Sequence, residues 1–239
     1  MKAPYLQRIT FEQGDGGSYP FSLPFWKNGE FEFYFDQEIT ILTGRNGIGK
    51  SSFLSGIAAG AGFGKLGGSL AHNISAVDAS FAGCVRLSWT RKATRGYYFR
   101  ADKLSDMVAY LDGIAGEGDA RVYQGLNDRS LNYQSHGQAI SALIKKYAGS
   151  AKQPTLVILD EPETSLSIAS QIDLAFFIQE AARNNIQFVI ATHSPVFMAI
   201  PNAGLFDVSD AGINGISLER SEAYLLTRQL IKEGSSFFS

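Results

Sequence analysis

Two continuous apolar runs, Leu156–Leu159 and Val189–Ala191, stand out along the chain. Runs without polar alternation are typical of strands buried on both faces in a parallel sheet. Residues 168–183, between them, repeat apolar positions at helical spacing, so this part of the chain predicts a β-α-β unit. Upstream, the β-rich run Ile39–Thr43 ends at a glycine, and the small and apolar residues from Ser51 to Ala61 predict a helix after it.

Weaker patterns predict further elements. They are strands over residues 30–35, 84–100, 205–208 and 216–218, and helices over residues 103–114, 139–148 and 223–232. No internal repeat, heptad run or low-complexity linker interrupts them. The pattern therefore predicts one α/β domain over residues 1–239.

Composition is that of a folded protein, with 239 residues, 45% apolar and 18% charged. The formal net charge of −2 gives nucleic-acid binding no support, and the basic residues between 86 and 100 fit a solvated strand pair as well as a local basic stripe. The single cysteine, Cys84, excludes an internal disulfide, and neither the amino terminus nor residues 57–68 resemble a signal peptide or a membrane span. We therefore expect a cytoplasmic protein.

The strongest motif lies between the run 39–43 and the helix that follows it. It fits the pattern GxxxxGK[ST] of a phosphate-binding loop, in the strand-loop-helix context that this loop requires. Its backbone N–H groups surround phosphates, its lysine reaches the β- and γ-phosphates, and its serine can bind Mg²⁺. The predicted nucleotide-binding residues here are Gly44, Arg45, Asn46, Gly47, Ile48, Gly49, Lys50, Ser51 and Ser52.

Two further polar groups follow the buried runs. Asp160 and Glu161 come directly after Leu156–Leu159, at the carboxyl end of a strand, where open α/β sheets bind ligands. Asp160 is the expected Mg²⁺ carboxylate together with Ser51, and Glu161 the expected base for the attacking water. His193 ends the second run and either contacts the γ-phosphate or has a structural role.

Together with Ser135-His136-Gly137-Gln138 at a predicted helix start, these motifs stand in the order found in ABC-class ATPases. The resemblance implies a P-loop NTPase fold of ABC type. Such a fold has a mainly parallel central sheet flanked by helices, an amino-terminal antiparallel β part, and a helical signature region at about residues 100–150. It also implies bound ATP and Mg²⁺, and an ATP-dependent homodimer in which Ser135, Gly137 and Gln138 contact the nucleotide of the opposing subunit.

More closely, the chain resembles small stand-alone bacterial ATPases of the SMC and overcoming-lysogenization-defect branches, through Tyr19-Pro20-Phe21, Asp160-Glu161-Pro162-Glu163 and Ala191-Thr192-His193-Ser194-Pro195. Three positions depart from transporter ATPases: His136 replaces a signature glycine, Glu163 replaces a threonine, and Ser167 replaces the D-loop aspartate. Two roles stay unassigned. Gln124 and Arg100 are available for the Q-loop position, and Tyr19 and Trp26 for adenine stacking, although packing explains both aromatics.

The resemblance implies ATP hydrolysis that drives a dimerisation switch in DNA maintenance or phage defence, with an effector protein as partner. Two alternatives are the nucleotide-binding subunit of an ABC transporter and a scaffold that dimerises on ATP without hydrolysing it. The departures count against the transporter, and the intact Lys50, Asp160 and Glu161 count against the scaffold.

Overall fold

The computed structural model describes residues 2–12, 19–26, 31–63, 68–69, 81, 83–103, 142, 153–164 and 166–238. The predicted signature residues Ser135, Gly137 and Gln138 lie outside this part of the chain, as does Gln124. The two helices predicted over residues 103–114 and 139–148 lie almost wholly outside it.

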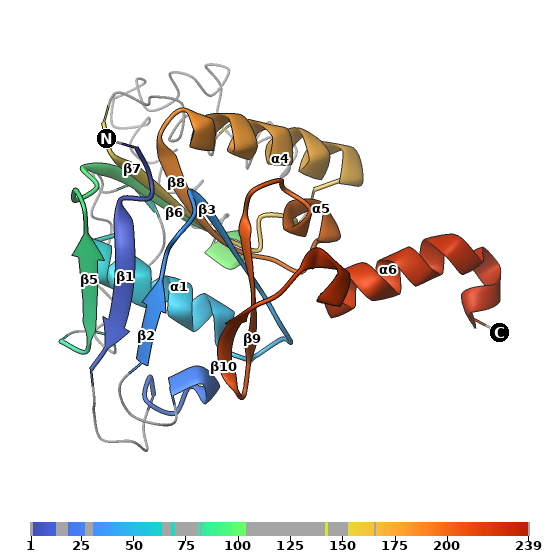
Figure 1. Ribbon diagram of the computed structural model, residues 1–239, viewed down its shortest axis with the longest axis horizontal. Helices are drawn as coiled ribbons and strands as arrows, with labels where there is room; N and C mark the ends of the chain where they lie inside the picture. The colour runs from blue at the N-terminus through green and yellow to red at the C-terminus, as the bar shows by residue number, and fades with distance from the viewer. Residues whose placement is uncertain are drawn as a thin grey trace.

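The described residues form a seven-stranded sheet at the centre of the molecule (Figure 1). Its strands, in spatial order, are β10 (Gly212–Gly215), β9 (Gly204–Ser209), β3 (Ile39–Thr43), β8 (Ile186–Ala191), β7 (Thr155–Asp160), β6 (Arg95–Arg100) and β4 (Gly68–Ser69). The five inner strands are parallel, and β10 and β4 pair antiparallel at the edges. The predicted parallel core is therefore confirmed.

Helices cover both faces of this sheet. Along β7, Val157 and Leu159 face the core shared with α4 (Ile168–Arg183) and α5 (Pro195–Met198), whereas Leu156 and Ile158 face the core shared with α1 (Lys50–Ala61). Successive side chains of a strand point to opposite faces, so an uninterrupted apolar run supplies both cores. All three helices are also visible in Figure 1.

A second, antiparallel sheet of order β2-β1-β5 packs beside α1, with β1 spanning Leu6–Phe11, β2 Phe31–Tyr34 and β5 Val85–Trp89. Aromatic rings fill the space between this sheet and α1. The ring of Phe11 lies 4.4 Å from that of Trp26 and 6.0 Å from that of Phe53, between centroids. Trp26 is 4% exposed, so the structure assigns it to packing rather than to adenine stacking. Tyr19 is more exposed and contacts the ring of Phe81 edge-on.

One buried side chain joins the two sheets. The Oε1 atom of Gln187, on β8, accepts hydrogen bonds from the backbone N–H groups of Tyr5 (2.9 Å) and Leu6 (2.8 Å), and its Nε2 donates to the Leu6 carbonyl (2.9 Å). Gln187 is fully buried. It therefore satisfies the backbone at the start of β1, which would otherwise lose its hydrogen bonds on burial.

The carboxy-terminal region corrects one prediction. Residues 216–218 do not form a strand; β10 lies earlier, at Gly212–Gly215, and residues 218–220 form a 3₁₀ turn. Gly212 adopts a φ of +115°, which allows the short connection from β9. Strand β10 therefore begins directly after this turn, ahead of the apolar residues 216 and 218 on which the prediction was based. The helix after it, α6, spans Glu222–Glu233 and projects from the body (Figure 1).

None of the helices in the described residues is long and apolar enough to cross a bilayer.

We predict that Gln187→Met lowers the free energy of unfolding by about 2–4 kcal/mol, because it leaves two buried N–H groups and one carbonyl without partners. Urea denaturation measures this loss. The matched control Gln37→Met, at an exposed position, should change the free energy by less than about 0.5 kcal/mol. Equal effects of the two substitutions would contradict a specific role for Gln187.

Candidate nucleotide-binding site

The loop between β3 and α1 has the backbone that the phosphate-binding motif requires. Gly44, Gly47 and Gly49 all have positive φ, of +135°, +75° and +108°, a region in which other residues are strained. At Gly44 a Cβ atom would lie 2.3 Å from the carbonyl oxygen of Val208. Gly49 is the N-cap of α1, so the loop leads directly to a helix amino terminus, which attracts anions.

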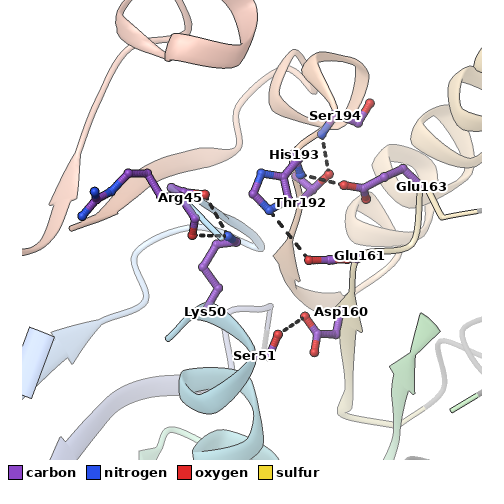
Figure 2. A network of polar contacts seen from close by, with 10 residues as sticks. Arg45, Lys50, Ser51, Asp160, Glu161, Glu163, Thr192, His193 and Ser194 are labelled. Atoms are coloured by element: carbon purple, nitrogen blue, oxygen red, sulfur yellow. Dashed lines mark hydrogen bonds and ion pairs between the residues drawn. The ribbon is translucent and has the colours of Figure 1, made fainter. Parts of the chain in front are cut away.

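Lys50, the first residue of α1, extends its side chain back over this loop (Figure 2). Its Nζ atom donates to the carbonyl oxygens of Gly44 (2.8 Å) and Arg45 (3.0 Å), and the side chain is buried. Burial lowers the pKa of Lys50, and the carboxylates of Glu161 and Asp160 oppose this shift. A phosphate group in the loop would give the buried ammonium a negative partner, which would compensate for the solvation that the ammonium loses on burial.

Ser51 and Asp160 connect the loop to the end of β7. The Ser51 hydroxyl donates to Asp160 Oδ1 at 3.0 Å. Burial raises the pKa of Asp160 to about 6, although this hydrogen bond opposes the shift. Hydroxyl and carboxylate oxygens are the ligands that Mg²⁺ prefers, and in nucleotide sites Mg²⁺ takes only one or two protein groups beside phosphate oxygens. These two residues therefore fit the predicted Mg²⁺ role.

Glu161 occupies a strained position directly after Asp160. Its φ is +51°, a conformation that is uncommon for residues other than glycine, and its backbone N–H donates to the Ala191 carbonyl at 2.9 Å. Its Oε1 atom lies 3.7 Å from Nε2 of His193. Figure 2 shows the side chains of Glu161 and His193 directed toward the space that also contains the end of the Lys50 side chain.

Glu163 fixes the backbone of the histidine, since its Oε1 atom accepts a hydrogen bond from the His193 N–H at 2.6 Å. Among the described residues, Glu163 Oε2 and His193 Nε2 are buried without a hydrogen-bond partner. Burial and the charge of Lys50 lower the pKa of His193, which favours the neutral imidazole. A buried, unpaired ring nitrogen beside Glu161 and Lys50 is available to a ligand in this space.

Two residues that sequence reasoning missed hold the histidine segment in place. Gln171, buried on α4, donates through Nε2 to the Leu166 carbonyl (3.1 Å) and accepts through Oε1 from the Ser194 hydroxyl (2.6 Å). Ser194 also caps α5, accepting from the Val196 N–H. A glutamine in an otherwise apolar helix face was the only sequence signal for this link.

A cavity of about 540 Å³ adjoins the loop on the side of β9. Arg45, Asn46 and His193 line one part of it, and the start of α6 at Glu222 lines another. Asp207, on β9, also lies here; burial and the Glu222 carboxylate raise its pKa. The start of α6 is thus part of the same space as the phosphate-binding loop.

The structure brings most of the predicted site residues to one edge of the sheet. They are the loop residues 44–52 with Asp160, Glu161 and His193. Arg100 ends β6 in register with Asp160 and pairs with Asp102 at 2.9 Å. The chemical roles of all these residues stay predictions, and Ser135, Gly137 and Gln138 lie outside the described residues.

Comparison with solved structures agrees with this geometry. The chain matches an SMC head bound to the C-terminal winged-helix domain of ScpA with a TM-score of 0.53 and 14% identity, covering 91% of this chain and 99% of that one. It matches a structure described as "An inward-facing conformation of a putative metal-chelate type ABC transporter" with a TM-score of 0.52 and 18% identity, covering 93% of this chain and 88% of that one. The chain has the fold of a P-loop ATPase of the ABC and SMC type.

A protein-family model also matches part of the chain. Residues 91–199 match a family described as "AAA domain, putative AbiEii toxin, Type IV TA system". The matched segment contains Asp160, Glu161 and His193 but not the phosphate-binding loop, so this match and the loop motif are independent observations. No curated protein matches the chain significantly in sequence.

We predict that Gly44→Ala lowers the free energy of unfolding by about 3 kcal/mol or more, because its Cβ would overlap a backbone oxygen and its φ is unfavourable. Gly47→Ala is the matched control. No atom lies within 4 Å of the added Cβ there, so only the backbone strain of about 1 kcal/mol should appear. Urea denaturation of both variants measures the difference, and equal losses would contradict the close approach of Gly44 to Val208.

Proposed function

We propose that this protein binds ATP with Mg²⁺ in the loop 44–52 and hydrolyses it. The observation that carries the proposal is the hydrogen bond of 3.0 Å between Ser51 and Asp160. It places the hydroxyl at the start of α1 against the carboxylate at the end of β7, so one ion could contact both. The geometry of Lys50, buried over the loop with its pKa lowered, supports phosphate binding at the same place.

In the proposed reaction, Glu161 accepts a proton from a water molecule as the water oxygen attacks the γ-phosphorus of ATP. The bond between the γ-phosphorus and the bridging oxygen breaks, and ADP and phosphate result. Lys50 stabilises the charge on the phosphate oxygens, while neutral His193 donates a hydrogen bond to one of them through its ring N–H. Glu161 Oε1 and His193 Nε2 lie 3.7 Å apart, which supports the proposal that both side chains lie beside the attacked phosphorus. Mg²⁺ held by Ser51 and Asp160 would supply further charge neutralisation.

We further propose that ATP closes two copies face to face, with Ser135, Gly137 and Gln138 of one copy against the nucleotide of the other. Hydrolysis then reopens the pair, so ATP acts as a switch by favouring the closed state. The ABC-type fold supports this proposal. The loop residues and His193 lie at the open sheet edge, where a second copy could reach the nucleotide.

For the biological role we propose a switch in DNA maintenance or phage defence that acts through an effector protein. Residues 91–199 match a family whose description names a toxin and a type IV TA system. This match supports a role in DNA maintenance or phage defence over a role in transport. Glu163 supports it as well, because it replaces the threonine of transporter ATPases and its Oε1 atom accepts a hydrogen bond from the His193 N–H at 2.6 Å.

We predict that Glu161→Gln lowers kcat for ATP hydrolysis by about 10²–10⁴-fold while ATP binding is kept, because the amide cannot accept the proton of water. Phosphate release and isothermal calorimetry measure the two properties. Glu38→Gln, at the opposite end of β3, is the matched control and should leave both unchanged. A Glu161→Gln protein with more than a third of the parent rate would exclude Glu161 as the base.

We predict that Lys50→Ala weakens ATP binding by at least about a hundredfold, because it removes the ammonium group that the β- and γ-phosphates would contact. Calorimetry with ATP and Mg²⁺ measures the affinity. The exposed Lys92→Ala variant is the control for a lost positive charge. Unchanged affinity of Lys50→Ala would place the nucleotide elsewhere.

We predict that the Glu161→Gln protein doubles its mass in light scattering when ATP and Mg²⁺ are added, because the closed pair can no longer hydrolyse its nucleotide. ADP with Mg²⁺ should leave the mass unchanged. A monomer under saturating ATP would contradict the two-copy mechanism and leave hydrolysis by single copies.

A further inference from the structure

The backbone that follows β8 takes one of its hydrogen-bond acceptors from a side chain of the neighbouring segment. The N–H of Thr192 donates to the Leu42 carbonyl of β3 at 3.0 Å, and the N–H of Ser194 donates to Thr192 Oγ1 at 3.0 Å. Between them, the N–H of His193 donates to Glu163 Oε1 at 2.6 Å. This distance is at the short end for charge-assisted hydrogen bonds, which are stronger than neutral ones. The histidine backbone is therefore held mainly by the Glu163 carboxylate.

The backbone of Glu161 explains why the histidine needs a side-chain acceptor. Strands β7 and β8 are parallel, and the Glu161 N–H donates to the Ala191 carbonyl at 2.9 Å. In a continued parallel ladder, the next bond would run from the His193 N–H to the Glu161 carbonyl. The φ of +51° at Glu161 turns the chain away, and its carbonyl accepts from the Thr164 N–H at 3.1 Å instead. The Glu163 carboxylate thus takes the place of a strand carbonyl.

One turn therefore carries both the proposed base and the anchor of the histidine. Glu163 follows Glu161 by two residues, and its own carbonyl accepts from the Leu166 N–H at 2.9 Å, which closes the turn. Glu161 Oε1 lies 3.7 Å from His193 Nε2. Figure 2 shows Glu163 directed at the backbone of the histidine and Glu161 directed at its ring. A shift of the His193 backbone would change the distance between the ring and Glu161.

Glu163 makes this contact at a cost in free energy. Its Oε2 atom is buried and, among the described residues, has no hydrogen-bond partner. A desolvated carboxylate oxygen without a partner destabilises the folded state. Unsatisfied buried groups are uncommon in folded proteins and call for an explanation in terms of function. Holding the histidine in place for a reaction is such an explanation.

We propose that Glu163 is a positioning residue for ATP hydrolysis, which sets the place of the His193 imidazole relative to Glu161 and the γ-phosphate. This inference rests on the proposed hydrolysis and adds a residue to it. Glu163 acts through the His193 N–H and touches neither the attacking water nor the phosphate. Its loss should therefore slow hydrolysis while ATP still binds.

Steady-state kinetics with ATP and Mg²⁺ test this role. Glu163→Ala should lower kcat by about 10–100-fold, as the loss of a residue that orients a reacting group does, and calorimetry should find the Kd for ATP within about threefold of the parent. Glu163→Gln keeps an acceptor oxygen for the N–H and should retain at least about a third of the parent kcat. The matched control is Glu180→Ala, which removes an exposed carboxylate on α4 and should leave kcat unchanged.

A double-mutant cycle with His193→Ala shows whether Glu163 acts through the histidine. In the His193→Ala protein, Glu163→Ala should lower kcat by less than about threefold further, because the ring that it positions is already absent. A further loss as large as that in the parent would overturn the proposal. So would a Glu163→Gln variant as slow as Glu163→Ala, because the charge rather than the acceptor would then be required.

Hydrogen exchange reads the contact without any turnover. The chain has three histidines, so labelling with ¹⁵N-histidine gives three backbone amide signals, and His193→Ala identifies the signal of His193. Its amide hydrogen should exchange at least about tenfold faster in Glu163→Ala than in the parent, because a hydrogen bond to a charged group is lost. Glu163→Gln should lie between the two. Should Glu163→Ala fail to fold, Glu163→Met takes its place, since it fills similar space but offers no oxygen acceptor.

The outcomes separate this inference from the proposed function. A parent protein that does not hydrolyse ATP overturns the proposed function, and the positioning role with it. A parent that hydrolyses ATP, together with a Glu163→Ala variant of unchanged kcat or unchanged His193 amide exchange, overturns the positioning role alone.

Discussion

Parallel pairing of β3, β8 and β7 is the constraint on which the rest of the structure depends. It brings the end of β3 to the same edge of the sheet as the ends of β7 and β8, which lie more than a hundred residues later along the chain. Each strand ends in a different chemical group: the phosphate-binding loop after β3, two carboxylates after β7 and a histidine segment after β8. Hydrogen bonds and burial then refine positions that the register has already set.

Several polar groups at this edge carry charges or polar atoms that the protein leaves incompletely compensated. Burial lowers the pKa of Lys50 and raises that of Asp160, which means that each charged form lacks solvation there. An anion near the ammonium and a cation near the carboxylate would remove both deficits. Glu163 Oε2 and His193 Nε2, buried without partners among the described residues, belong to the same pattern. These uncompensated groups cost stability, which is the pattern expected of the proposed nucleotide site.

Much of this arrangement could be predicted from sequence because its signals are local. The apolar runs 156–159 and 189–191 specify strands buried on both faces, and the glycines of the loop specify backbone that other residues avoid. The strand predicted at 216–218 was wrong because a glycine turn, which has no periodicity, fixes the register of β10 earlier. Strand β1 was missed because its alternation is weak, and its place depends on Gln187, some 180 residues away. Contacts of that range leave no local pattern.

Gln171 gives the site a mechanical property. A single amide joins the segment that follows the carboxylates, at Leu166, to the segment that follows the histidine, at Ser194. The two segments cannot separate without breaking one of these buried bonds, so they move as one body with α4. A load on the outer surface of α4 would therefore shift the carboxylate and imidazole segments together relative to the phosphate-binding loop, which makes this helix a mechanical link between the molecular surface and the proposed nucleotide site.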